Sequence, residues 1–67
     1  MPADHLDART LLAVAVVCEA RARDHRSNAR DWSIHGDNDA SRYRIACADE
    51  NERIARRLRE MAGELSR

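Results

Sequence analysis

Alanine recurs at every seventh position through the first half of the chain, and this spacing restricts the possible folds more than any other feature. A second series follows each alanine by three residues. The two series are Ala8, Ala15, Ala22 and Ala29, and Leu11, Cys18, His25 and Trp32. Two series that alternate at spacings of three and four residues form the seam between packed helices. Here the first of the two series consists of alanines. We therefore expect one long helix from about residue 5 to about residue 31, capped by Asp4.

The second half of the chain has a heptad repeat of its own. Its two series are Arg44, Asn51, Leu58 and Leu65, and Cys47, Ile54 and Met61. Between the halves, the segment SIHGDND at residues 33–39 is rich in turn-forming residues. The pattern predicts a turn at about 33–38 and a second helix at about 39–64, capped by Asp37 or Asp39. The expected fold is all-α: one domain, an antiparallel, coiled-coil-like two-helix hairpin with an alanine-rich seam.

An antiparallel hairpin pairs residues whose numbers add up to a constant, and a turn near residue 38 makes that sum about 76. With this sum each interior alanine faces a larger side chain, and His25 faces Asn51 in a polar layer that fixes the register. A sum of 69 would set His25 against Arg44, and a sum of 83 would need helix through Gly36, so both are less favourable. The predicted seam residues are Leu11, Ala15, Cys18, Ala22, His25, Asn51, Ile54, Leu58, Met61 and Leu65.

The longest apolar run is LLAVAVVC at residues 11–18, and it carries more apolar surface than one seam covers. Leu11 and Cys18 belong to the seam, whereas its other large residues point elsewhere and need a second cover. The simplest cover is the same surface of another copy, which gives a two-fold homodimer and a four-helix bundle. The predicted dimer interface comprises Leu12, Ala13, Val16, Val17 and Ala20.

Other interpretations of this run are less favourable. Valine favours strands, but only SRYRIA at residues 41–46 offers a second strand. An export signal needs a positive segment before the run, where Asp4 and Asp7 stand against Arg9. The run is also too short to span a bilayer, which takes about 20 residues. We therefore expect a cytoplasmic protein that does not associate with a membrane.

Charge is balanced, with 12 basic and 12 acidic residues, and every basic residue is arginine. Together with the abundant alanine, this composition is typical of a bacterial or phage protein from a GC-rich genome. Acidic residues stand among the arginines, so an ion-paired surface is the simplest interpretation. The alternative is binding to a nucleic-acid backbone. The arginines that would do so are Arg21, Arg23, Arg26, Arg30, Arg53 and Arg56.

No arrangement typical of catalysis occurs in the sequence. It has no glycine-rich phosphate loop and no serine elbow, and Cys18 lies in the apolar run, where burial keeps a thiol inert. A metal site would combine His25, Cys47 and Glu50, but no ligand spacing such as CxxC accompanies them. We therefore expect a non-enzymatic protein without a cofactor or a metal.

Large side chains also gather around the turn, at Trp32, Ile34, Tyr43 and Arg44. They either close the end of the hairpin, with Arg44 stacked on Trp32, or bind another protein. We predict a small protein–protein interaction module, a bacterial or phage regulator or inhibitor that acts as a helical homodimer. The alternative is a dimeric nucleic-acid-binding regulator that uses the arginine clusters.

Overall fold

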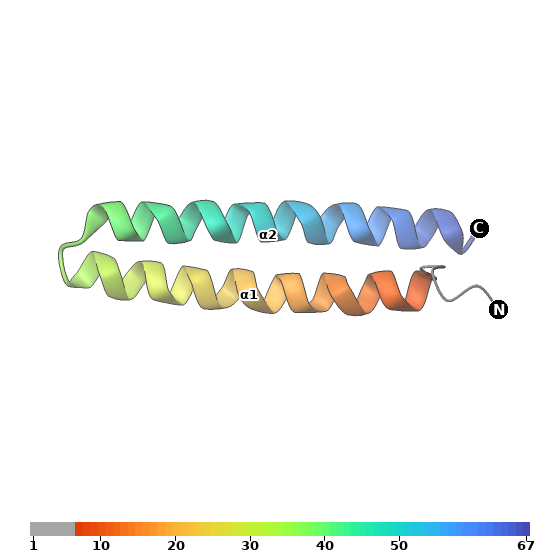
Figure 1. Ribbon diagram of the computed structural model, residues 1–67, viewed down its shortest axis with the longest axis horizontal. Coiled ribbons are helices and arrows are strands. Elements are labelled where there is room, and N and C mark those ends of the chain that lie inside the picture. The colour runs from red at the N-terminus through yellow and green to blue at the C-terminus, as the bar shows by residue number, and fades with distance from the viewer. Residues whose placement is uncertain (1–6) are drawn as a thin grey trace.

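The computed structural model describes residues 7–67 as two antiparallel helices joined by a short turn (Figure 1). Helix α1 spans Ala8–Ile34 and helix α2 spans Asn38–Leu65. The helices lie side by side along their whole length, with the turn at one end and the start of α1 and the end of α2 at the other (Figure 1). The described part of the chain contains no strand. The predicted all-helical hairpin is therefore confirmed.

An aspartate caps the start of each helix. The Asp7 carboxylate accepts a hydrogen bond of 2.8 Å from the Thr10 amide, and this bond lowers the pKa of the Asp7 carboxyl. The Asp37 carboxylate likewise accepts a bond of 3.0 Å from the Ala40 amide. The expected helix start near residue 5, and its expected cap Asp4, lie outside the described residues. Helix α1 continues to Ile34, past the expected end near residue 31.

The turn between the helices depends on Gly36. Its φ of +83° lies in the left-handed region, which side chains with a Cβ rarely adopt. In this conformation the Gly36 amide donates to the Ser33 carbonyl at 3.0 Å and the Asp37 amide donates to the Trp32 carbonyl at 2.9 Å. These bonds satisfy carbonyls that the end of α1 would otherwise leave without partners. The turn is thereby held at residues 35–37.

The interior of the hairpin consists almost entirely of small side chains. Residues at heptad spacing on both helices form two facing rows, and Leu11 is the one large side chain among the buried residues that the structure describes. Because the alanine side chain is a single methyl group, two such rows let the helix backbones approach closely. The buried residues are Leu11, Ala15, Ala22 and Ala29 on α1, and Ser41, Ala48, Ala55 and Ala62 on α2.

The centre of the seam on α2 differs from the sequence-based prediction. We expected the series of Ile54 and Met61 inside, but the buried row is the alanine series that follows it by one residue. Ile54 is 38% exposed and Leu65 is 58% exposed. The physical reason is that alanine packs against alanine here, so the larger residues are pushed to the flanks of the seam. The expected pairing of each interior alanine with a larger residue was wrong.

The hairpin is one helix thick. Its extents are 52 × 20 × 13 Å, and the shortest is close to the diameter of a single helix, about 10–12 Å. Helical domains usually bury their apolar faces between at least two layers. Neither described helix contains an uncharged apolar stretch of the length needed to cross a bilayer.

Candidate protein-interaction surface

The seam has two flanks with different chemistry. A helix advances about 100° per residue, so residues four after a buried position lie on one flank, and residues three after or one before it lie on the other. We call the first flank the ionic edge; it comprises Glu19, Arg26, Ile45, Glu52 and Arg59. The second flank carries polar residues such as His25 and Asn51 in the half nearer the turn and is apolar in the other half. We call that other half the apolar edge; it comprises Val14, Cys18, Ile54, Leu58, Met61 and Leu65.

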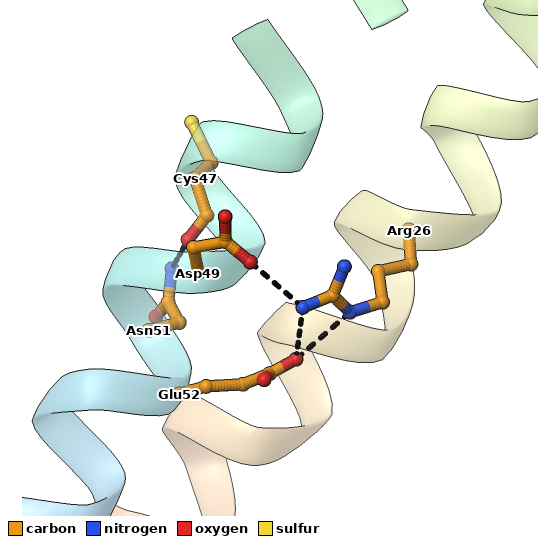
Figure 2. Close-up of polar contacts among 5 residues, drawn as sticks. All are labelled: Arg26, Cys47, Asp49, Asn51 and Glu52. Carbon is orange, nitrogen blue, oxygen red and sulfur yellow. Dashed lines mark hydrogen bonds and ion pairs between the residues drawn. The ribbon is translucent and has the colours of Figure 1, made fainter. Parts of the chain in front are cut away.

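Ion pairs join the two helices along the ionic edge. Arg59 donates two hydrogen bonds to the Glu19 carboxylate, at 2.9 and 2.7 Å, and they lower the pKa of Glu19. One heptad along, Arg26 of α1 reaches between two carboxylates of α2 (Figure 2). It bonds Glu52 at 2.8 Å and Asp49 at 2.9 Å, and these contacts raise the pKa of the Arg26 guanidinium. The polar groups of this edge are therefore paired within the chain.

Most of the arginines predicted to bind nucleic acid lie on the side of the ionic edge, where acidic side chains stand among them. Arg26 is held by Glu52 and Asp49, and Arg53 by Glu50, whose pKa is lowered by that contact. The other four form no ion pair within residues 7–67, and they are Arg21, Arg23, Arg30 and Arg56. Arg21 and Arg23 stand on either side of buried Ala22 and so flank the seam on opposite sides.

The polar layer predicted between His25 and Asn51 was wrong. The Asn51 amide instead donates to the Cys47 carbonyl of its own helix at 2.8 Å (Figure 2). The His25 ring nitrogen Nδ1 lies 3.2 Å from a guanidinium nitrogen of Arg44. Arg44 can donate to this nitrogen only when it carries no proton. The cross-helix pairs Glu19–Arg59 and Arg26–Glu52 have numbers that add up to 78, close to the predicted sum of 76. Arg44 therefore contacts His25 without the register whose sum is 69.

The apolar edge presents large side chains to solvent. Val14 is 45% exposed and Leu65 is 58% exposed, while Cys18, Leu58 and Met61 are half-buried. Both helices contribute to this edge near the end of the hairpin that lies away from the turn. In this half of the hairpin the flank is therefore apolar and partly exposed to solvent.

The residues of the predicted dimer interface lie mainly on the outer face of α1. Leu12 and Ala13 are exposed, Val16 is 52% and Val17 is 51% exposed, and Ala20 is half-buried. Val17 lies next to Val14 around the helix, because the two positions are separated by about 60°. Val17 therefore borders the apolar edge, whereas Leu12, seven residues before Glu19, and Val16 lie on the side of the ionic edge.

Two of the four residues predicted to bind a partner near the turn lie together. Trp32 and Arg44 line an open hollow of about 430 Å³, together with Asn28, Asp31 and His35. The guanidinium of Arg44 lies 6.0 Å from the centre of the Tyr43 ring, at the limit of a cation–π contact.

The remaining two predicted partner-binding residues lie outside the hollow. Ile34 is 81% exposed and Tyr43 is 65% exposed, and neither lines it. The four residues therefore do not form one site around the turn.

No ligand cluster assembles from the residues considered for a metal site. Within residues 7–67, no three His, Cys, Asp or Glu side chains lie close enough to hold an ion together. Cys18 and Cys47 are free, half-buried thiols.

The chain matches no known family model, no curated protein and no solved structure. Its surface is therefore the basis on which function can be argued.

Sequence reasoning missed Val14 as a surface residue and placed Ile54, Met61 and Leu65 inside the seam. The pattern that identifies them is the spacing of Ala48, Ala55 and Ala62, which repeats the spacing of the first helix. Once that series occupies the interior, the residue before each alanine must lie on the flank.

Proposed function

We propose that this chain is a non-enzymatic protein–protein interaction module that acts as a homodimer, with two hairpins packed into a four-helix bundle. The supporting observation is that small side chains are buried while large apolar side chains are exposed. Within residues 7–67 the seam contains alanines, one leucine and one serine, whereas ten large apolar side chains are exposed. A chain of 67 residues that leaves its large apolar groups in water is a marginal folding unit, and a partner that covers them stabilises it.

The outer face of α1 supplies part of the stabilisation. Complete burial of a valine or leucine contributes about 1.5–3 kcal/mol, so covering a side chain that is half exposed contributes about 1 kcal/mol. Leu12, Val16 and Val17 are all close to half exposed. In a symmetric dimer each of these gains is counted twice, once in each chain.

Sedimentation equilibrium at micromolar concentration tests the proposal. The wild-type chain is expected at twice its 7.6 kDa mass, and Val16→Asp is expected to dissociate or unfold it because a charge enters the interface. Ala46→Asp is the control, since Ala46 is exposed on α2 outside the proposed interface. A stable, helical wild-type monomer would refute the dimer.

The hollow near the turn is where we propose that a regulatory partner binds. Trp32 and Arg44 are residue types that dominate interaction hot spots, and the dimer interface does not use them. We propose that a bacterial or phage regulator or inhibitor of this size contacts its target there. Trp32→Ala is expected to abolish retention of the native target in a pull-down while the dimer persists. Retention equal to that of the wild-type chain would exclude this hollow as the binding site of the partner.

Nucleic-acid binding is the competing proposal. Three arginines without ion pairs within residues 7–67, Arg23, Arg30 and Arg56, follow a buried alanine by one residue and so lie on one side of the hairpin, which favours it. The carboxylates of Glu19, Asp49 and Glu52 on that side oppose it, because they repel phosphates. Salt-dependent retention on immobilised DNA, lost when Arg23 and Arg30 are replaced with Gln, would support this alternative. We expect the chain to elute without such retention.

A further inference from the structure

A serine interrupts the alanine row of α2 at the end nearest the turn. The buried positions of this helix are Ser41, Ala48, Ala55 and Ala62. Ser41 is 9% exposed, and its hydroxyl forms no hydrogen bond within residues 7–67. Every fully buried polar side-chain atom that the structure describes does have a partner. The Ser41 hydroxyl must therefore keep an opening to solvent.

That opening is a hollow of about 350 Å³ on the ionic edge, at the end nearest the turn. Ser33 and Ile45 stand one heptad nearer the turn than Arg26 and Glu52, so the row of cross-helix ion pairs stops at this point. A serine and an isoleucine face each other where the next ion pair would lie. The lining residues are Arg26, Ala29, Arg30, Ser33, Ser41 and Ile45.

The polar groups of this hollow are hydrogen-bond donors. Arg30 forms no ion pair within residues 7–67. Arg26 bonds its two carboxylates through Nε and Nη2, and no bond is drawn from its third nitrogen (Figure 2). The hydroxyls of Ser33 and Ser41 can donate as well. No carboxylate of the described chain lines the hollow, so its donors are suited to an anionic acceptor from outside.

The charges around the hollow favour a carboxylate over a phosphate. Arg26 and Arg30 carry two positive charges, and Asp49 and Glu52, which hold Arg26, carry two negative ones. A carboxylate adds one negative charge to this neutral group, whereas a phosphate monoester adds about 1.5–2 at pH 7 and is repelled more strongly. The side chain of Ile45 is 42% exposed and offers an apolar wall to the hydrocarbon part of a ligand.

From these observations we propose that the hollow binds a carboxylate carried on a short aliphatic chain. Arg30 supplies the opposite charge, the Ser41 hydroxyl donates a hydrogen bond, and the aliphatic chain packs on Ile45. A free aliphatic acid and the glutamate side chain of a peptide present this same group. The proposal does not require the homodimer, because Leu12 and Val16 lie toward the other end of the hairpin.

Two arginines on the same side of the hairpin provide a matched test. The dissociation constant for butyrate is measured at pH 7 and constant ionic strength from the NMR shifts of the Ser41 and Ile45 amides. Arg30→Gln is expected to raise it at least about tenfold, because a bond to a charged group is lost. Arg23→Gln is the control and is expected to change it by less than about twofold. Arg23 also follows a buried alanine by one residue but does not line the hollow.

Ser41→Ala tests the hydroxyl without disturbing the seam. Alanine already occupies the other three buried positions of α2, so the variant is expected to stay folded and at least as stable as wild type. Its dissociation constant for butyrate is expected to rise about threefold to tenfold, the effect of one lost hydrogen bond. Unchanged binding in a folded Ser41→Ala chain would overturn the role of the hydroxyl.

Three ligands distinguish the sources of the carboxylate and its competitor. Similar binding of butyrate and of N-acetylglutamate α-amide would support a site that reads the carboxylate alone. Binding of the glutamate compound without butyrate would assign the hollow to an acidic side chain of a partner. Tighter binding of inorganic phosphate than of either acid would overturn the choice of a carboxylate. If neither acid shifted the Ser41 and Ile45 amides to saturation, the whole proposal would be wrong.

Discussion

Glu19 and Arg59 stand forty residues apart in the sequence, and two parallel hydrogen bonds of 2.9 and 2.7 Å join their side chains across the helices. Each residue follows a buried alanine by four positions, Glu19 after Ala15 and Arg59 after Ala55. One contact thus fixes which flank of α1 faces which flank of α2. The flank that it defines is polar, and in the half of the hairpin away from the turn the opposite flank is apolar.

The Glu19 contact should make stability depend on pH in the acid range. Its pKa in the folded chain is lowered by Arg59, so the stabilisation is fully present above the ordinary pKa of glutamate and is lost as the pH falls through the lowered value. Glu19→Gln is expected to lower the thermal midpoint slightly at pH 7 and to have no effect at the acid end. Thermal unfolding, followed by circular dichroism from pH 7 into the acid range, measures the difference in thermal midpoint between wild type and variant. Asp24→Asn is the control. A difference between wild type and variant that does not change with pH would contradict the prediction.

Enlarging the seam should destabilise the hairpin. Ala22 is 2% exposed, so Ala22→Leu must push the helices apart and is expected to cost about 1–3 kcal/mol in free energy of unfolding. Ala46→Leu adds the same group on an exposed face and is expected to change stability by less than about 0.5 kcal/mol. Urea titration of both variants gives the comparison, and equal midpoints would mean that the alanine rows do not set the helix spacing.

Removing the cap of α2 should weaken the chain without altering its seam. The Asp37 carboxylate accepts the Ala40 amide at 3.0 Å, and loss of such a cap costs about 1 kcal/mol. Asp37→Ala is expected to show this loss in chemical denaturation, whereas Asp37→Asn keeps an acceptor and most of the stability. If both variants lost the same amount, the side-chain oxygen would not be the cause.

The two glycines should respond to alanine with opposite signs. Gly36 has a φ of +83°, so Gly36→Ala is expected to destabilise by about 1–2 kcal/mol. Gly63 is helical and has open space where a Cβ would lie, so Gly63→Ala is expected to stabilise by up to about 1 kcal/mol. Thermal unfolding of the two variants and of wild type measures both changes in stability. A loss at both positions would show that space or helix propensity at Gly63 is not the governing factor.

The fold follows from the sequence because heptad spacing and turn chemistry are local properties. The helix containing Ala15 and Ala22 and the turn at Gly36 were predictable from spacing alone. The rotation of α2 about its own axis was not predicted. The interior was assigned to the series of larger residues that contains Ile54, whereas the buried series contains Ala55. Where two helix backbones come into close contact, the small side chains are buried and the large ones lie on the flanks. The spread of the four partner-binding residues, with Ile34 outside the hollow, also depends on helix rotation.

The alanine rows separate two tasks that most small proteins assign to the same residues. Folding of the hairpin depends on positions such as Ala22 and Ala55, while recognition would depend on flanking positions such as Ile45. Substitutions on the flanks can therefore change which molecule is bound while the scaffold stays the same. A chain built in this way can acquire new binding specificity through surface changes alone, without first finding a new way to fold.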